Sequence, residues 1–530
     1  MTTKIVYLPL DERPCNWLYP QQLAAITDLE MIVPPVEKLG RKKQRADLGG
    51  LSGWLEEQSS TADFLIISID MLVHGGIVPS RLHHESVEAC RERMMLLHKL
   101  KQSNPRLRIY AFNLITRVPA YSSSEEEPDY YDQVGREIYE LGWLSDKKES
   151  VGLDGLEEGR FNEVLAAIPV EVLADYRKRR ETNAEVNRLA VDLTEAGIID
   201  YLIIPLDDNS QYGFSAMEQR ELTIRTELAG LSHRVAIYPG ADEIGCTLLA
   251  RVFCEVKSYT PSLFVRYSST KGPYCIPKYE DRSLGESMKA HITAAGAVQA
   301  DASTDAACIL MVHSPAVGQH EMAETGDSIE NRHRSYFSEI NTREFAQAMK
   351  HYMDAGRLVM LADVALCNGG DQLLMNLLHQ SGLLGRLQGY AAWNTSGNSL
   401  GTVISHAVIQ SYYRSIQQPD DESSSHSRLF YLSRLIEDWG YQSLVRQEVC
   451  ADHLPELGAA YFQLSHVQDK VCEVIERKLN DFVNKYLRDT IAPNMTVSDV
   501  SLPWERMFEV AFRLDTGKPE ERHTLQGGQN

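Results

Sequence analysis

The sequence repeatedly places a short apolar run directly before a cluster of acids, amides or glycines. Six runs have the length of a β-strand and an ending of this kind: KIVYLPL, FLIISI, YLIIPL, VAIYPG, LVMLA and GYAAW. In parallel α/β sheets the loops at the carboxyl ends of the strands converge on one crevice, where ligands bind. The pattern therefore predicts a shared acidic cleft, and a shared acidic cleft suggests an enzyme.

Helical patterns alternate with these apolar runs. Strands are expected at 4–9, 30–34, 64–69, 107–113, 201–206, 234–238, 262–267, 307–313, 358–362 and 389–393. Helices are expected between them, at Asn16–Thr27, Val87–Gln102, Ala216–Leu231, Leu284–Ala295, Thr342–Ala355, Asp371–Ser381 and Leu400–Ser415. This alternation favours mostly parallel sheets with crossover connections. Ten units exceed an eight-fold barrel, so we predict an α/β fold with two doubly wound, Rossmann-like domains; a (β/α) barrel with extra units is the alternative.

Two segments interrupt the alternation and suggest the domain boundaries. We expect an N-terminal α/β domain at 1–258, a second α/β domain at 259–416, a helical C-terminal region at 428–513 and a flexible tail at 514–530. Residues 118–199 form a helical insertion in the first domain, which either caps the cleft or is a surface hairpin unrelated to it. The stretch 417–427 has the composition of a linker.

Charge and composition narrow the class of protein. A net charge of −21 argues against a nucleic-acid partner and against an anionic membrane surface. No apolar stretch approaches the roughly 20 residues that a membrane helix needs, and no signal peptide is visible. The nine cysteines are scattered without a C-x-x-C pair, which fits reduced thiols. We expect a cytoplasmic protein; its oligomeric state is left open.

Several standard catalytic signatures do not occur in the sequence. It contains no G-x-x-x-x-G-K-[ST] phosphate loop, no H-E-x-x-H, no G-x-S-x-G and no dinucleotide fingerprint. Nucleotide-driven, zincin and α/β-hydrolase mechanisms are therefore disfavoured.

Two pairs of carboxylates are the candidates for catalysis. Asp207 and Asp208 follow an apolar strand, and two acids held close together in a low-dielectric site cannot both ionise easily, so one becomes a general acid. The alternative is a turn, which Asp-Asp-Asn-Ser also suits. Asp242 and Glu243 are the candidates for the base or nucleophile, although Asp242 is also a good residue to begin a helix.

Further polar residues near the strand ends are candidates for substrate binding. They include a possible anion clamp, Arg13, and an aromatic residue beside amides, Trp393, a combination that suits sugars. The first half contributes Asp11, Glu12, Arg13, Asp70, His74, Arg117, Asn209 and Tyr212. The second half contributes Asp363, Asn368, Asp371, Trp393, Asn394 and Asn398.

Several of these segments are also similar to a known family. YLPLDERPCN, IPLDDNSQYG, GADE, NGGD and WNTSGNSLGT together resemble the bacterial domain-of-unknown-function family 4127, over essentially the whole chain. The resemblance implies that these segments belong to one protein family. It implies no activity or substrate.

From the residues we predict a hydrolase that acts on a small, polar, carbohydrate-like substrate by carboxylate acid–base chemistry, without a cofactor or a tightly held metal. Asp208 is the expected general acid and Asp207 its orienting partner. One alternative is a divalent-metal hydrolase of phosphoester or amide bonds, with ligands from Asp11, Asp70, His74, Asp207 and Asp242. Another is a two-domain sugar-binding protein without activity, although neutral sugars do not require so many acids.

Overall fold

The computed structural model of the protein describes residues 2–416, 421–489 and 491–516. Two open sheets dominate it, one of six strands in the order β2-β1-β3-β4-β5-β6 and one of five in the order β11-β10-β9-β7-β8. The first sheet consists of β1 (Lys4–Leu8), β2 (Glu30–Ile32), β3 (Phe64–Ser68), β4 (Arg108–Phe112), β5 (Tyr201–Leu206) and β6 (Val235–Pro239). The second consists of β7 (Ser262–Tyr267), β8 (Val298–Gln299), β9 (Cys308–His313), β10 (Val359–Asp363) and β11 (Gly389–Ala391).

Every strand pair within these two sheets is parallel. The prediction of an α/β fold with doubly wound, mostly parallel sheets is thus confirmed, whereas the barrel alternative is wrong. The two sheets also share one topology. In each, the first strand along the chain lies inside the sheet, the second strand pairs with it on one side, and the later strands follow on the other side. The order reverses between β1 and β3 in the first sheet and between β7 and β9 in the second. Such reversal points open the crevice in which doubly wound proteins bind ligands.

The first sheet is buried on both faces, so its strands are apolar at successive positions. Val6 and Leu8 of β1 pack towards α2, α3, α5 and α8, while Ile5 and Tyr7 pack towards α1 and α10. This double burial explains why the strands read as continuous apolar runs. The helices of this half are α1 (Pro14–Ala24), α2 (Leu48–Ser59), α3 (Ile69–His74), α4 (Ile77–Leu82), α5 (Val87–Ser103), α6 (Tyr131–Ser150), α7 (Gly155–Ala167), α8 (Val170–Glu195), α9 (Phe214–Leu228) and α10 (Ile244–Lys257).

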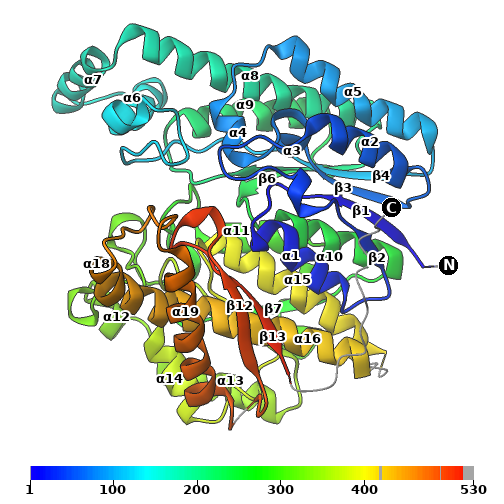
Figure 1. Ribbon diagram of the computed structural model, residues 1–530, viewed down its shortest axis with the longest axis vertical. Coiled ribbons are helices and arrows are strands. Elements are labelled where there is room, and N and C mark those ends of the chain that lie inside the picture. The colour runs from blue at the N-terminus through cyan, green and yellow to red at the C-terminus, as the bar shows by residue number, and fades with distance from the viewer. Residues whose placement is uncertain (1, 417–420, 490, 517–530) are drawn as a thin grey trace.

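The second sheet is also covered on both faces. α11 (Leu284–Ala294) and α15 (Ser396–Ser415) pack on one face, and α13 (Thr342–Asp354) and α14 (Gln372–Gln380) on the other. α10 packs against α15, so these two helices lie between the sheets and join the two halves (Figure 1). The short helix α12 (Ser335–Ser338) belongs to the loop that follows β9.

The C-terminal region packs on the second half and is mostly helical. It contains α16 (Asp421–Arg434), the π-helical segments η5 (Leu435–Val445), η6 (Val449–His453) and η7 (Val483–Leu487), and the helices α17 (Arg446–Glu448), α18 (Leu454–Glu456) and α19 (Gln468–Phe482). It ends in an antiparallel pair, β12 (Thr496–Ser501) and β13 (Ala511–Asp515), which the sequence pattern did not predict. The loop between these strands reaches the junction of the two halves (Figure 1).

Several predicted boundaries need revision. Residues 421–427, which have linker composition, belong to α16. Residues 514–515 of the expected tail belong to β13. The rest of the expected linker, 417–420, and residues 517–530 of the tail lie outside the described residues. In the 118–199 insertion, α8 packs beside α5 and β5 as an ordinary crossover helix, while α6 and α7 project from the molecule (Figure 1). Within the described ranges, no helix combines the length and apolar character needed to span a membrane.

Candidate functional site

A cavity of about 170 Å³ lies where the carboxyl ends of the two sheets face each other. Its volume is close to that of a cavity that holds one benzene ring, about 150 Å³. Loops that follow β1, β4, β5 and β6, and helix α4 after β3, line it from the first half; loops that follow β7, β10 and β11 line it from the second. Its polar lining consists of Arg13, Arg81, Arg117, Tyr121, Glu126, Asp207, Asp208, Asp242, Tyr279, Glu280, Asn368, Asn394, Thr395, Asn398 and Arg506.

Arg13 joins the ends of the first and last strands of the six-stranded sheet. Its Nη2 donates to Asp11 Oδ2 at 2.7 Å and to Asp242 Oδ1 at 2.5 Å. Asn16 Nδ2 also donates to both acids, at 3.0 Å to Asp11 and 2.9 Å to Asp242. Both Asp242 oxygens are held, because Arg13 Nη1 lies 3.4 Å from Oδ2. Asp242 is therefore a fixed wall of the cavity, and Asp11 supports Arg13 from behind.

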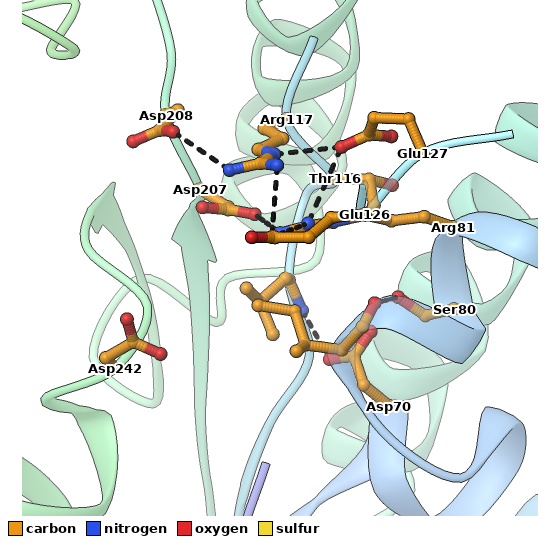
Figure 2. Close-up of polar contacts among 12 residues, drawn as sticks. Asp70, Ser80, Arg81, Thr116, Arg117, Glu126, Glu127, Asp207, Asp208 and Asp242 are labelled. Atoms are coloured by element: carbon orange, nitrogen blue, oxygen red, sulfur yellow. Dashed lines mark hydrogen bonds and ion pairs between the residues drawn. The ribbon is translucent and has the colours of Figure 1, made fainter. Parts of the chain in front are cut away.

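A second ion-pair cluster carries the Asp207–Asp208 pair (Figure 2). Arg81 Nη2 donates to Asp207 Oδ2 at 2.6 Å, and Arg117 Nη1 lies 3.4 Å from Asp208 Oδ2. Glu126 accepts from both arginines, at 2.9 Å from Arg81 and 3.1 Å from Arg117. Asp207 is thus held tightly, while Asp208 has only one long contact and a side chain that is 29% exposed.

The loop between β12 and β13 closes the cavity from the C-terminal region. Arg506 donates to Glu126 and to Glu509, and Glu509 also accepts from Arg13 at 3.2 Å. The Trp504 ring contacts the guanidinium groups of Arg13 and Arg506, each 4.5 Å from its ring centroid. Residues almost five hundred positions apart in the chain therefore form one wall.

The four arginines of the lining all pair with carboxylates, although Arg81 Nε is buried without a hydrogen-bond partner. Arg13, Arg81 and Arg117 each pair with three acids, and Arg506 pairs with two. They form the framework that positions the acids, and they are poorly placed to receive an anion. The polar atoms that remain for a ligand are mainly carboxylate and amide oxygens, which suit a ligand that donates hydrogen bonds, such as a polyol.

The pKa values of three lining acids, Asp208, Asp242 and Glu280, lie above their ordinary range. Burial raises the pKa of Asp208 to about 7, with a further increase from the Asp207 charge, and Arg117 and Arg81 oppose it. Burial also raises the pKa of Asp242 to about 6, against the attraction of Arg13. Asp208 therefore titrates near neutral pH, in the most open position of the three aspartates.

Strained backbone is concentrated around the cavity. Asp208, Tyr279, Asn368 and Asn394 have positive φ angles of 21°, 68°, 64° and 60°, and all four line the cavity. The backbone ties them in pairs, because Asn209 N donates to Tyr279 O at 2.9 Å and Asn368 N donates to Asn394 O at 2.8 Å. Strain of this kind persists where the surrounding structure imposes it, and it gathers at functional sites.

The structure brings many of the predicted residues together. Arg13, Arg117, Asp207, Asp208, Asp242, Asn368, Asn394 and Asn398 line the cavity. Asn398 does not cap α15, because Thr395 does; its Oδ1 instead accepts from the Asp242 amide at 3.2 Å.

Other predicted residues of the first half lie outside the lining. Asp70 is buried below it, where Oδ2 accepts from the Leu114 amide at 2.9 Å and burial raises its pKa to about 7. His74 is buried and stacks on His83, with ring centroids 4.1 Å apart. Glu12 is bonded to the Trp504 indole at 2.6 Å.

The residues that flank the carboxylate pairs also lie elsewhere. Glu243 is buried near Gly401 and His291, with Oε2 bonded to the Ala241 amide at 3.0 Å, and burial raises its pKa to about 8. Asn209 is buried and donates to the Leu206 carbonyl. Tyr212 packs edge-on against Trp143. The structure therefore does not bring these three predicted residues to the cavity.

Three predicted residues of the second half serve packing or local structure. Asp371 caps α14 and contacts His313 and Arg332, both at 3.1 Å. Burial alone would raise the pKa of Asp371, but the contacts with His313 and Arg332 lower this pKa to about 2. Asp363 Oδ2 accepts from the Asp371 amide at 2.8 Å. Trp393 is a core residue that packs edge-on against Phe508. The aromatic residues in the lining are instead Tyr121, Tyr279, Phe462 and Phe508.

Sequence reasoning missed Arg81, Glu126, Glu280 and Arg506. Glu126 lies in the 118–199 insertion, which was expected to cap the cleft or to be unrelated to it. The loop before α6 contributes to the lining, whereas α6 and α7 do not. Arg506 follows no strand of either main sheet, and local sequence carries no sign that it reaches the cavity. Within residues 2–416, 421–489 and 491–516, no group of three or more His, Cys, Asp or Glu side chains is arranged to hold a metal ion.

Comparison with known proteins assigns the chain to a family. No curated protein matches the chain. A family model described as "protein of unknown function (DUF4127)" matches residues 5–513, which confirms the resemblance seen in the motifs. The match covers both sheets and the C-terminal region, and the chain therefore belongs to the DUF4127 family.

Proposed function

We propose that the protein is a hydrolase of small, polar, carbohydrate-like substrates, with Asp208 as general acid. The observation that carries the proposal is the contrast between the paired aspartates. Asp207 is fixed by Arg81 at 2.6 Å, whereas Asp208 has one contact at 3.4 Å and titrates near neutral pH, because burial raises its pKa to about 7. A protonated carboxyl with a free oxygen is what a leaving group needs as a proton donor.

The shape and chemistry of the cavity support the substrate class. Its volume of about 170 Å³ suits one sugar-sized ring, so the substrate is a small glycoside or the end of a longer one. Asn368, Asn394 and Asn398 offer amides to hydroxyl groups, and the aromatic side chains of Phe462 and Phe508 offer apolar surface to a ring face. The engaged arginines argue against a substrate recognised through a phosphate.

A panel of nitrophenyl glycosides tests this proposal directly. The purified protein should release nitrophenol from at least one member, and Asp305→Asn, which changes an exposed aspartate, should not alter the rate. Release of phosphate from nitrophenyl phosphate, lost on chelation, would instead support the metal-dependent alternative. Binding of sugars without turnover would support the sugar-binding alternative.

A further inference from the structure

Glu280 is a buried acid that no predicted role includes. It lies in the loop after β7, at the reversal point of the second sheet, and it lines the cavity. The other lining acids come from loops of the first half, so Glu280 is the acid that the second half contributes to this cavity.

One oxygen of Glu280 is held and the other is not. The Ser287 hydroxyl on α11 donates to Oε2 at 2.5 Å. Oε1 is buried without a hydrogen bond of normal geometry, near the Gly397 amide at the start of α15. Burial raises the pKa of the Glu280 carboxyl to about 7, and the hydrogen bond from Ser287 opposes this rise. An unsatisfied buried carboxylate oxygen costs free energy, so its retention calls for a role.

The backbone fixes Glu280 relative to Asp208. Tyr279 has a φ of 68°, and its carbonyl accepts the Asn209 amide at 2.9 Å. This hydrogen bond joins the residue before Glu280 to the residue after Asp208 across the junction of the two halves. Both loops are strained, since Asp208 has a φ of 21°. The hydrogen bond therefore ties the loop that carries Glu280 to the loop that carries Asp208.

Asp242 and Glu243, the residues expected to supply the base, are less suited to that role. Both oxygens of Asp242 are engaged by Arg13 and Asn16. Glu243 is buried towards α15 and lies outside the lining. Glu280 combines a place in the lining with an unengaged oxygen, and it has a hydroxyl partner that sets its orientation.

We propose that Glu280 is the general base of the reaction, a role that rests on the proposed function. Glu280 takes a proton from a water molecule as the water oxygen bonds to the anomeric carbon. The bond from that carbon to the leaving oxygen breaks, and its electron pair stays on the leaving oxygen, which receives the proton of Asp208. One water is consumed, and the two carboxyl groups exchange their protonation states, which solvent then restores.

The experiment compares Glu280→Gln with Asp208→Asn on two substrates, one nitrophenyl glycoside and one alkyl glycoside of the same sugar. Loss of a base slows both substrates, so Glu280→Gln should lower kcat by about 10²–10⁴-fold on each. Loss of the acid should spare the nitrophenyl substrate, because its leaving group needs little protonation. Glu286→Gln, an exposed change on α11 with a side chain 62% exposed, is the control and should keep the wild-type rate.

A second variant separates the chemical role from a structural one. In Glu280→Ala, azide should restore turnover of the nitrophenyl substrate by attacking the anomeric carbon in place of water, and the product should be a glycosyl azide. Wild-type rates in Glu280→Gln, or a folded Glu280→Ala that azide does not rescue, would overturn the role of Glu280 alone. A wild-type protein that hydrolyses no glycoside in the panel would overturn the proposed function, and the role of Glu280 with it.

Discussion

Arg13 and Asp242 are 229 positions apart in the chain, and their side chains meet at 2.5 Å at the edge of the six-stranded sheet. The parallel arrangement makes this possible, because β1 and β6 end on the same side. The contact places the guanidinium among Asp11, Asp242 and Glu509, and so connects the first strand, the last strand and the C-terminal loop.

Replacing Arg13 should therefore destabilise the whole fold. Arg13→Met leaves three buried acids without their shared cation, and breaking a buried ion pair in this way costs about 3–5 kcal/mol. Arg41→Met is the matched control, because Arg41 pairs with Glu505 on the surface, where such a pair is worth about 0–1 kcal/mol. Chemical denaturation of both variants measures the difference. Equal losses would show that the Arg13 cluster contributes no special stability.

The Asp208→Asn variant should lose activity and keep its fold. Removal of a general acid costs about 10²–10⁴-fold in rate. The side chain makes a single contact, at 3.4 Å, so the melting temperature should change little. Rates on an alkyl glycoside and a thermal melt test both statements. A variant that unfolds, and whose remaining folded fraction is fully active, would identify Asp208 as a structural residue.

Glu126→Gln should affect both stability and the pH profile. Glu126 is shared by Arg81, Arg117 and Arg506, so its loss should lower the free energy of unfolding by about 3–5 kcal/mol. Its charge also raises the pKa of Asp208, after the larger effects of burial and Asp207. Without the Glu126 charge, the pKa of Asp208 should be lower, so the loss of activity at alkaline pH should begin at a lower pH.

The neighbouring acid provides the control for that variant. Glu125 pairs with Lys42 and has a side chain 36% exposed. Glu125→Gln should therefore change stability by about 1 kcal/mol or less, and it should leave the alkaline side of the pH profile in place. If both variants move the profile equally, the change does not arise from the effect of the Glu126 charge on Asp208.

The stability of the fold should fall with rising pH through Glu243. Burial raises the pKa of Glu243 from 4.5 to about 8, so the folded state holds this proton more tightly than the unfolded chain. The contribution of Glu243 to the free energy of unfolding is complete below the pKa that this residue has in the unfolded chain. It is lost as pH rises through the pKa that Glu243 has in the folded state. Each pH unit that separates the folded pKa from the unfolded pKa is worth about 1.4 kcal/mol of stability.

Glu243→Gln should remove that dependence. Between about pH 5 and about pH 8, the wild type should lose on the order of 4 kcal/mol more than the variant, by the same linkage. Urea denaturation at a series of pH values measures both slopes, and Glu286→Gln serves as an exposed control. Parallel slopes for wild type and Glu243→Gln would contradict the assignment.

Chelation should leave activity and melting temperature unchanged if acid–base chemistry alone operates. A metal that binds only the folded state would stabilise it, and its removal would lower the melting temperature. Treatment with EDTA, followed by a glycoside assay and a thermal melt, makes the comparison. A stoichiometric metal in the purified protein, together with loss of activity on chelation, would favour the metal-dependent alternative.

The local sequence was sufficient to identify ten of the eleven strands of the two main sheets, all except β8, and several residues at their ends. Runs such as YLIIPL are apolar at every position because both faces of each sheet are covered, and the strand predicted at 201–206 has those bounds in the structure. An acid that directly follows such a run lies at the carboxyl end of its strand, where a loop begins. Asp207, Asp208 and Asp242 could therefore be placed in one cleft without coordinates.

What only the tertiary structure decided is which of those acids are free and which are engaged. Asp70 and Asp208 both follow apolar strands, yet one is buried under the Leu114 amide and the other opens into the cavity. The roles of Glu126, Glu280 and Arg506 depend on contacts between segments up to 380 positions apart. The sequence determines strands because burial and backbone geometry act locally; it leaves partners undetermined because they depend on how the two sheets and the C-terminal loop pack together.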